Sequence, residues 1–169
     1  ADCMYSGIMI DTNNFMTKTG VRTFEAAAFL RRNGADVVRV RKLFRDDLDD
    51  YKAKAEAVRE AEIFEGCFAI STCPSEGIES PTVVGAQAAN ELLDIAGMKA
   101  SIVMTFYNNT IYLSARSIDE VNVQVMMGKL GGGGHRTIAG AQLKDMSLEE
   151  ARNRVKEVIR DMLEKGDIS

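Results

Sequence analysis

Apolar residues recur along this chain with two different periods, and each period predicts its own kind of element. Spacings of three and four residues, typical of helices with one buried face, occur in six segments. Short apolar and β-branched runs, typical of strands in a covered sheet, occur in four others. The predicted helices cover residues 1–12, 23–33, 51–64, 81–93, 121–130 and 147–163, and the predicted strands cover residues 67–72, 100–107, 110–114 and 138–143. Strands separated by helices indicate an α/β fold.

Residues that favour caps and turns separate these elements. Thr23 is placed to cap the second helix at its start, and Asn33-Gly34 is placed to end it. Asn108-Asn109 suits a tight turn between two strands. Ser147 and Glu150 have the spacing of a capping box, which predicts the start of the last helix.

The pattern divides the chain into three parts. Residues 1–46 are expected to be helical, and the apolar first helix is expected to be buried. Residues 47–65 carry charges on most faces of a predicted helix, which we interpret as a connector between two lobes. Residues 66–169 contain the predicted strands, so we expect a smaller α/β lobe with a mixed sheet there.

Composition excludes several classes of protein. The 169 residues are 46% hydrophobic and 27% charged, which is typical of a globular chain. The net charge of −4 gives no overall attraction for a polyanion, and no apolar run approaches the roughly 20 residues of a membrane span. We therefore expect no long nucleic acid as a partner and no membrane contact by this segment. Because the chain starts with Ala1 rather than Met, we expect it to be a piece of a longer protein.

The strongest chemical signal is a run of four glycines, residues 131–134, followed by His135. A glycine in an ordered element costs about 0.5–1 kcal/mol relative to alanine, so such a run is expected where backbone approaches a ligand or adopts positive φ. Successive amides can surround an anion, and His135 adds a donor or a positive charge. A flexible turn is the alternative. The run is not a P-loop, because His135-Arg136 stands where Gly-Lys-Ser/Thr is required.

Two further motifs carry polar side chains. Arg116, in Ser114-Ala115-Arg116-Ser117 at the end of a predicted strand, can hold a phosphate through two parallel N–H bonds. From this motif alone, a solvated surface arginine is the preferred interpretation. Asp11 follows the apolar residues 7–10, where a carboxylate is either a helix cap or a metal ligand. From the residues alone we favour the cap.

Taken together, these segments resemble the DHH phosphoesterase superfamily over almost the whole chain. Residues 7–12 are similar to the last metal-binding motif of a DHH domain, and Arg116 with the Gly-Gly-Gly-His sequence ending at His135 is similar to the signature of the DHH-associated domain. Within the superfamily, residues 11–15, 19–27, 41–44 and 140–143 are most similar to GdpP-type cyclic-di-AMP phosphodiesterases. The resemblance implies the end of a DHH catalytic domain in residues 1–46 and a substrate-binding domain in residues 66–169.

The resemblance also implies an activity and a set of site residues. Proteins of this type use manganese to open cyclic di-AMP to the linear dinucleotide pApA, and they are bacterial membrane-anchored proteins with a cytoplasmic DHH module. Asp11 would be a ligand of one manganese ion. The residues implied to bind the substrate are Arg116, Ser117, Asn122, Gly132, Gly133, Gly134 and His135. The sequence leaves a homodimer open.

The chain departs from the family in one respect. The Asp-His-His motif and the earlier metal-binding motifs are missing, and His135 is the one histidine. A two-metal site needs several carboxylates and imidazoles, and Asp11 is the one ligand that we assign. We therefore expect this chain to be inactive by itself.

Two alternatives stay open. The first is the same chemistry on another substrate: pApA or short oligonucleotides, as in oligoribonucleases, or single-stranded DNA, as in RecJ-like exonucleases. The acidic charge and an aromatic content of 7% without Trp disfavour long nucleic acid. The second is a non-catalytic sensor module that binds a nucleotide at the glycine run.

Overall fold

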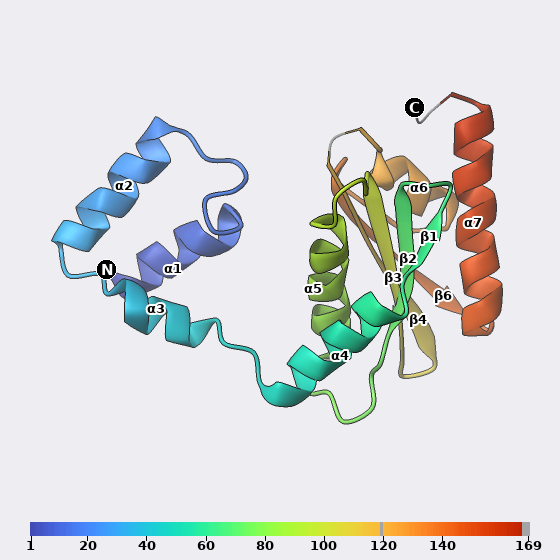
Figure 1. The fold of residues 1–169 in the computed structure, drawn as a ribbon, viewed down its shortest axis with the longest axis horizontal. Coiled ribbons are helices and arrows are strands. Elements are labelled where there is room, and N and C mark those ends of the chain that lie inside the picture. Colours follow the sequence, from blue (N-terminus) through green and yellow to red (C-terminus); the bar gives the residue numbers. More distant parts are fainter. Residues whose placement is uncertain (119, 167–169) are drawn as a thin grey trace. The chain divides into compact units, whose positions relative to one another are not determined.

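The computed structural model describes residues 1–118 and 120–166, and the chain divides into two compact units, Ala1–Asp46 and Asp47–Ser169 (Figure 1). The first unit contains the helices α1 (Asp2–Asp11), α2 (Val21–Arg32) and α3 (Val37–Leu43). The second contains α4 (Leu48–Arg59), β1 (Glu62–Phe64), β2 (Phe68–Cys73), α5 (Pro81–Leu93), β3 (Ala100–Tyr107), β4 (Thr110–Ser117), α6 (Val123–Lys129), β5 (Gly133–Gly134), β6 (Ile138–Lys144) and α7 (Leu148–Glu164). The predicted α/β class, with helices first and a sheet after them, is confirmed.

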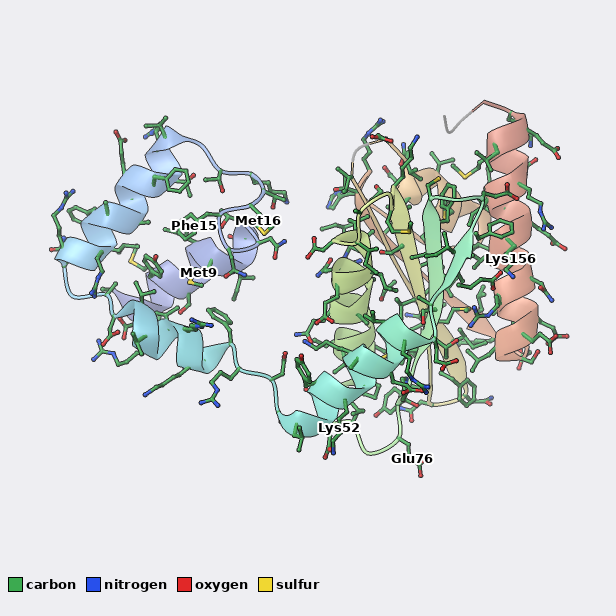
Figure 2. The ribbon with its side chains drawn as sticks, viewed as in Figure 1. Met9, Phe15, Met16, Lys52, Glu76 and Lys156 are labelled. Atoms are coloured by element: carbon green, nitrogen blue, oxygen red, sulfur yellow. The ribbon has the colours of Figure 1, made fainter. Side chains whose placement is uncertain are left out.

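A few contacts hold the helices of the first unit together. Phe15, in the loop after α1, stacks on Phe24 of α2 with the ring centroids 5.5 Å apart. Figure 2 shows Phe15 between α1 and α2. The carboxylate of Asp2 accepts hydrogen bonds from the amide of Asp36 (2.8 Å) and from Nε of Arg39 (2.9 Å), so it ties the start of α1 to α3.

The first helix forms as predicted, but it does not lie in a core. No residue of α1 is buried, and Met4 and Ile10 are 67% and 66% exposed. A helix that is apolar on most sides is typical of a buried segment. The prediction of burial is therefore wrong for this structure, because α2 and α3 cover too little of the surface of α1.

The second helix starts earlier than Thr23, the predicted cap. Its N-cap is Gly20, and Thr23 lies inside the first turn, where its hydroxyl accepts a hydrogen bond from the Gly20 amide at 3.3 Å. The predicted end is confirmed: α2 stops at Asn33, and Gly34 has a φ of +92°. The helix α3, which the pattern did not predict, is capped by Asp36, whose carboxylate accepts from two amides of its first turn.

The six strands form one mixed sheet in the order β1-β2-β3-β4-β6-β5, in which β2 and β3 are parallel and every other pair is antiparallel. The helix α5 makes the connection between the two parallel strands. Asn108 and Asn109, both at positive φ, form the predicted turn between β3 and β4. The predicted capping box is also present, because the Ser147 and Glu150 side chains each accept from the other's amide.

The predicted helix over residues 51–64 ends at Arg59, and residues 62–64 form β1 instead. Glu65 and Gly66 both adopt positive φ, which reverses the chain and lets β1 pair with β2. The remaining helix, α4, buries Ala53 and Ala57 in the second unit. It therefore packs within that unit rather than standing free of it.

Helices cover both faces of the sheet: α4 and α5 lie on one face, and α6 and α7 lie on the other (Figure 1). The core under α6 and α7 is the larger, and it contains Ile102, Met104, Met126 and Met127. Within the described residues, no helix is both long and apolar enough to cross a membrane.

Candidate functional site

One face of β4 and β6 carries the polar residues of this half of the sheet. Side chains alternate between the two faces of a strand. Ile111, Leu113 and Ala115 of β4 belong to the core under α6 and α7, so the residues between them lie on the opposite face, beside α5. We call this surface the β4–β6 face; its residues are Tyr112, Ser114 and Arg116 of β4 and, directly opposite them, Gln142, Gly140 and Ile138 of β6.

Arg116 is half-buried and held in place by neutral groups. Its Nε donates to Oδ1 of Asn90 on α5 at 2.9 Å, and its Nη1 donates to the carbonyl of Ala115 at 2.9 Å. Burial lowers the pKa of the Arg116 guanidinium, although an arginine stays protonated in proteins. Among the described residues, no carboxylate forms an ion pair with Arg116. A buried guanidinium of this kind is ordinarily paired with an anion, so the site is suited to a phosphate or carboxylate ligand.

The glycine run is folded onto β6. Gly133 and Gly134 form β5, which pairs with Gly140 and Ala139 of β6. A Cβ on Gly132 would overlap the Gly140 carbonyl, so no larger residue fits at position 132 without a shift of backbone. Gly134 has a φ of +147°, and its added Cβ would come within 2.5 Å of the Ile138 oxygen. The close backbone approach that the sequence predicts therefore exists, but it is made to a neighbouring strand.

Gly133 is different from its neighbours in the run. A Cβ added to it would meet no atom within 4 Å, and its φ lies in the ordinary range. Three neighbouring amides are already used: those of Gly131, Gly132 and His135 donate to main-chain carbonyls at 2.7–3.0 Å. These three amides do not form an open anion-binding loop in this conformation. Of the four glycines, Gly133 is therefore the one at which packing and backbone conformation best tolerate a side chain.

His135, Ser117 and Asn122 lie near one another at the end of β4: the carbonyl of Arg136, next to His135, accepts from the Ser117 hydroxyl and from the amide of Val123, the residue after Asn122. His135 is exposed, and its amide donates to the carbonyl of Ile138, the residue opposite Arg116. The Ser117 hydroxyl is buried and donates to the Val121 carbonyl at 2.6 Å. The side chain of Asn122 caps α6 by accepting from the amides of its first turn. Ser117 and Asn122 thus hold the local fold, while the imidazole of His135 faces solvent.

A hollow of about 380 Å³ lies on the β4–β6 face. Tyr112, Ser114 and Gln142 line it from the strands, Thr82 lines it from the start of α5, and Gly131 and Gly132 line it from the glycine run. The alternation of Ile111, Tyr112 and Leu113 is a sequence signal that could have identified Tyr112. The contribution of Asn90 and Thr82 depends on how α5 packs and has no such signal.

Asp11 lies in the first unit, at the end of α1. Thr12 is the C-cap of α1 and Gly20 is the N-cap of α2, so Asp11 caps neither helix and the preferred sequence interpretation is wrong. An acidic residue in the last turn of a helix is unfavourable next to the negative end of the helix dipole. Asp11 is exposed there, and within the described residues no three His, Cys, Asp or Glu side chains cluster closely enough to hold a metal. The residues present do not fit a dinuclear manganese site.

Comparison with known proteins identifies the second unit. The sequence model of the DHHA1 domain matches residues 67–164. This chain belongs to the DHHA1 domain family. The match covers the whole sheet from β2 onward together with α5, α6 and α7, and therefore contains Arg116, the glycine run and the hollow.

Relatives of the DHHA1 chain confirm the resemblance to cyclic-di-AMP phosphodiesterases. The cyclic-di-AMP phosphodiesterase GdpP of Geobacillus thermodenitrificans is 41% identical over 98% of this chain and 25% of that protein. The cyclic-di-AMP phosphodiesterase PdeA of Listeria monocytogenes is 42% identical over 92% of this chain and 24% of that protein. The chain thus spans about a quarter of the length of these relatives.

A solved structure confirms the fold. An exopolyphosphatase-related protein from Bacteroides fragilis matches 95% of this chain and 49% of its own chain, with a TM-score of 0.85 and 18% sequence identity. At this identity the likeness concerns the fold alone: the helices and the mixed sheet of the DHHA1 chain occur in a known structure.

Proposed function

We propose that this chain is the substrate-binding part of a manganese-dependent phosphodiesterase that hydrolyses cyclic di-AMP to pApA, and that it is inactive by itself. The proposal rests on one observation above all: Arg116 is a half-buried guanidinium with neutral partners and, among the described residues, no carboxylate in an ion pair. A phosphate oxygen pair would supply the missing anion. The names of the relatives support cyclic di-AMP as the source of that phosphate.

The side chains on the β4–β6 face divide the work of binding. Arg116 would hold a phosphate through the N–H groups that Asn90 and Ala115 leave open. His135, two strand spacings or about 10 Å across the sheet, would contact the same ligand with its imidazole. Ser117 and Asn122 would position the turn that carries His135, because the Ser117 hydroxyl and the amide of Val123, next to Asn122, both donate to the carbonyl of Arg136 in that turn.

The first unit would contribute Asp11 to the metal centre. An exposed carboxylate with no capping role, placed at the unfavourable end of a helix dipole, is compatible with a cation that offsets this cost. Since no cluster of ligands surrounds it in the described part of the chain, we propose that further ligands come from elsewhere in the intact protein. Membrane anchoring of that protein belongs to the same proposal.

Titration calorimetry with the 169-residue chain tests the proposal. Cyclic di-AMP and pApA should bind the unaltered chain, and Arg116→Ala should weaken binding about tenfold or more, because a hydrogen bond to a charged group contributes about 1.5–3 kcal/mol. Arg154→Ala is the matched control, since Arg154 is an exposed arginine on α7, on the opposite face of the sheet. With Mn²⁺ added, the chain should release no pApA.

Three results would contradict the proposal. The first is equal affinity of the Arg116→Ala variant and the unaltered chain for both dinucleotides. The second is production of pApA by a pure preparation of this chain. The third is tighter binding of a single-stranded oligonucleotide than of either dinucleotide, which would favour an exonuclease-like function.

A further inference from the structure

Asn90 lies at a position where an asparagine has no advantage for the helix that contains it. It belongs to the last turn of α5, which ends at Leu93, and it is exposed. Asparagine is a weak helix former, because its side chain competes for backbone hydrogen bonds, and alanine would be favoured there. In this structure Oδ1 of Asn90 accepts from Nε of Arg116 at 2.9 Å. The side chain of Asn90 therefore serves a contact outside its own helix.

Two adjacent residues of α5 are bonded to two strands that are paired with each other. Ser101 of β3 lies directly opposite Arg116 of β4 in the sheet. The buried hydroxyl of Ser101 donates to the carbonyl of Ala89 at 2.6 Å. The next residue of the helix is Asn90, which accepts from Arg116. A buried hydrogen bond between α5 and β3 thus sets the position of Asn90 beside Arg116.

Glu91, the residue after Asn90, is engaged elsewhere. Its carboxylate forms an ion pair with Nζ of Lys54 on α4 at 3.0 Å. The acceptor that α5 presents to Arg116 is therefore an uncharged amide, although a carboxylate is its neighbour in the sequence. An amide oxygen orients a guanidinium through a hydrogen bond and leaves its positive charge available to an anion.

The hydrogen bond to Asn90 limits how Arg116 can hold a ligand. A guanidinium has five N–H groups in one plane. Two oxygens of one phosphate can accept from Nε and Nη2 along the side of this plane, or from Nη1 and Nη2 at its tip. Because Nε already donates to Asn90, the tip is left for such a ligand. Within residues 1–118 and 120–166, the hydrogen bonds of Arg116 come from Nε and Nη1, so both N–H groups of Nη2 stay available.

We propose that Asn90 is the positioning residue of Arg116: its amide oxygen fixes Nε, so that Nη1 and Nη2 receive two oxygens of one phosphate. This inference rests on the proposed function for the phosphate itself. The hydrogen bond to Nε and the pairing of Ser101 with Arg116 do not depend on that function. Asn90 acts through Arg116 and needs no contact with the ligand.

The NMR signal of the Arg116 Nε–H group tests the orientation without a ligand. Arg116→Lys identifies the signal by removing it. In the unaltered chain this proton should exchange slowly with water. Asn90→Ala should accelerate the exchange about tenfold or more, because a hydrogen bond to a charged group is lost. Asn90→Asp keeps an acceptor oxygen at the same position and should retain the slow exchange.

Titration calorimetry with cyclic di-AMP tests the consequence for binding. Asn90→Ala should weaken binding about twofold to tenfold, because the released Arg116 side chain must be ordered again when the ligand binds. In a chain that already carries Arg116→Ala, the same substitution should have no further effect, since a positioning residue acts only through its partner. The unfolding curve of Asn90→Ala should stay close to that of the unaltered chain, because Asn90 is exposed.

Glu91→Gln is the matched control. It changes the adjacent residue of α5 and weakens the ion pair with the buried Lys54, without altering a hydrogen bond of Arg116. It should lower stability while both the Nε–H exchange and the affinity for cyclic di-AMP stay unchanged. If Glu91→Gln weakened binding as much as Asn90→Ala does, Asn90 would only support the helix, and the inference would be overturned.

The outcomes distinguish this inference from the proposed function. If Arg116→Ala weakens cyclic di-AMP but Asn90→Ala changes neither exchange nor affinity, the positioning role is wrong and the proposed function stands. If Arg116→Ala binds as the unaltered chain does, the proposed function is contradicted, while faster exchange in Asn90→Ala still supports the orientation of Arg116. A further loss of affinity from Asn90→Ala in the Arg116→Ala chain would overturn the inference, because Asn90 would then act independently of Arg116.

Discussion

Met16, Val21 and Phe29 in the first unit are exposed by 69%, 76% and 59%, whereas Leu92, Ile102 and Met126 in the second are completely buried. The first unit, Ala1–Asp46, buries a few small or medium side chains, among them Ala27, Leu30, Ala35 and Val40. The second unit, Asp47–Ser169, contains two hydrophobic cores, one on each side of its sheet. The second unit is therefore stabilised by the burial of large apolar side chains, whereas the first unit buries few of them.

The difference has a functional meaning. The proposed phosphate site lies in the second unit, on a sheet whose opposite face is a packed core. A site on a rigid sheet keeps its geometry without help from other parts of a protein. Asp11 lies in the first unit, on a helix without buried residues. We infer that ligand binding is the property that this chain can express alone, and that metal binding needs ligands beyond those of the described residues.

The largest expected loss of stability comes from a cavity created in the core of the second unit. Ile102→Ala on β3 should lower the free energy of unfolding by about 2–5 kcal/mol, because it removes a fully buried side chain. Phe29→Ala on α2, at a side chain that is more than half exposed, should cost less than about 1 kcal/mol. Urea unfolding followed by circular dichroism measures both. A loss from Phe29→Ala as large as that from Ile102→Ala would contradict the small contribution expected from an exposed side chain.

A smaller effect concerns the glycine run, which pairs with β6 in the second unit. Gly132→Ala should lower the free energy of unfolding by about 1–3 kcal/mol, because its methyl group would overlap the Gly140 carbonyl. Gly133→Ala meets no atom within 4 Å and should leave stability within about 0.5 kcal/mol of the unaltered chain.

The same pair of variants separates stability from binding. If Gly133 is a glycine because ligand lies over it, Gly133→Ala should weaken binding of cyclic di-AMP while the unfolding curve stays unchanged. A Gly133→Ala variant that binds normally would show that the position has no role in the site. A Gly132→Ala variant of normal stability would show that the run is looser than its pairing with β6 indicates.

The sequence predicts this fold well where local signals and packing agree. Ser147 with Glu150 and Asn108-Asn109 define element ends that the structure reproduces. Prediction fails where a tertiary contact decides. Residues 62–64 have helix-compatible side chains but pair with β2, and Arg116 falls beyond the predicted end of β4 because β6 extends the pairing to that position.

The candidate site is predictable in part for the same reason. His135 and Arg116 are visible in the sequence as a motif, and the family match places both in the DHHA1 domain. The close backbone contact of Gly132 is with β6, and its part in substrate binding stays a prediction. Asn90 lies 26 residues from Arg116 and reaches it only through the packing of α5, so no local pattern could reveal that hydrogen bond.

The smallest effect tests the link that holds the first unit together. The pKa of Asp2 is lowered from 3.8, chiefly by the hydrogen bond from the Asp36 amide and then by Arg39. A carboxyl whose pKa is lower in the folded state stabilises the fold above its unfolded pKa, and this contribution is lost as the pH falls through the folded value. NMR signals of α1 and α3 should therefore titrate together with a midpoint below 3.8.

Asp2→Asn keeps an oxygen acceptor but removes the charge, so it should abolish that titration. Because the ion pair with Arg39 is exposed, the effect of this substitution on stability should be small and weakened by salt. Asp49→Asn, in an exposed pair of the second unit, is the control and should leave α1 and α3 unchanged. A midpoint at or above 3.8, or loss of signals from the second unit at the same pH, would show that Asp2 is not an independent tether of the first unit.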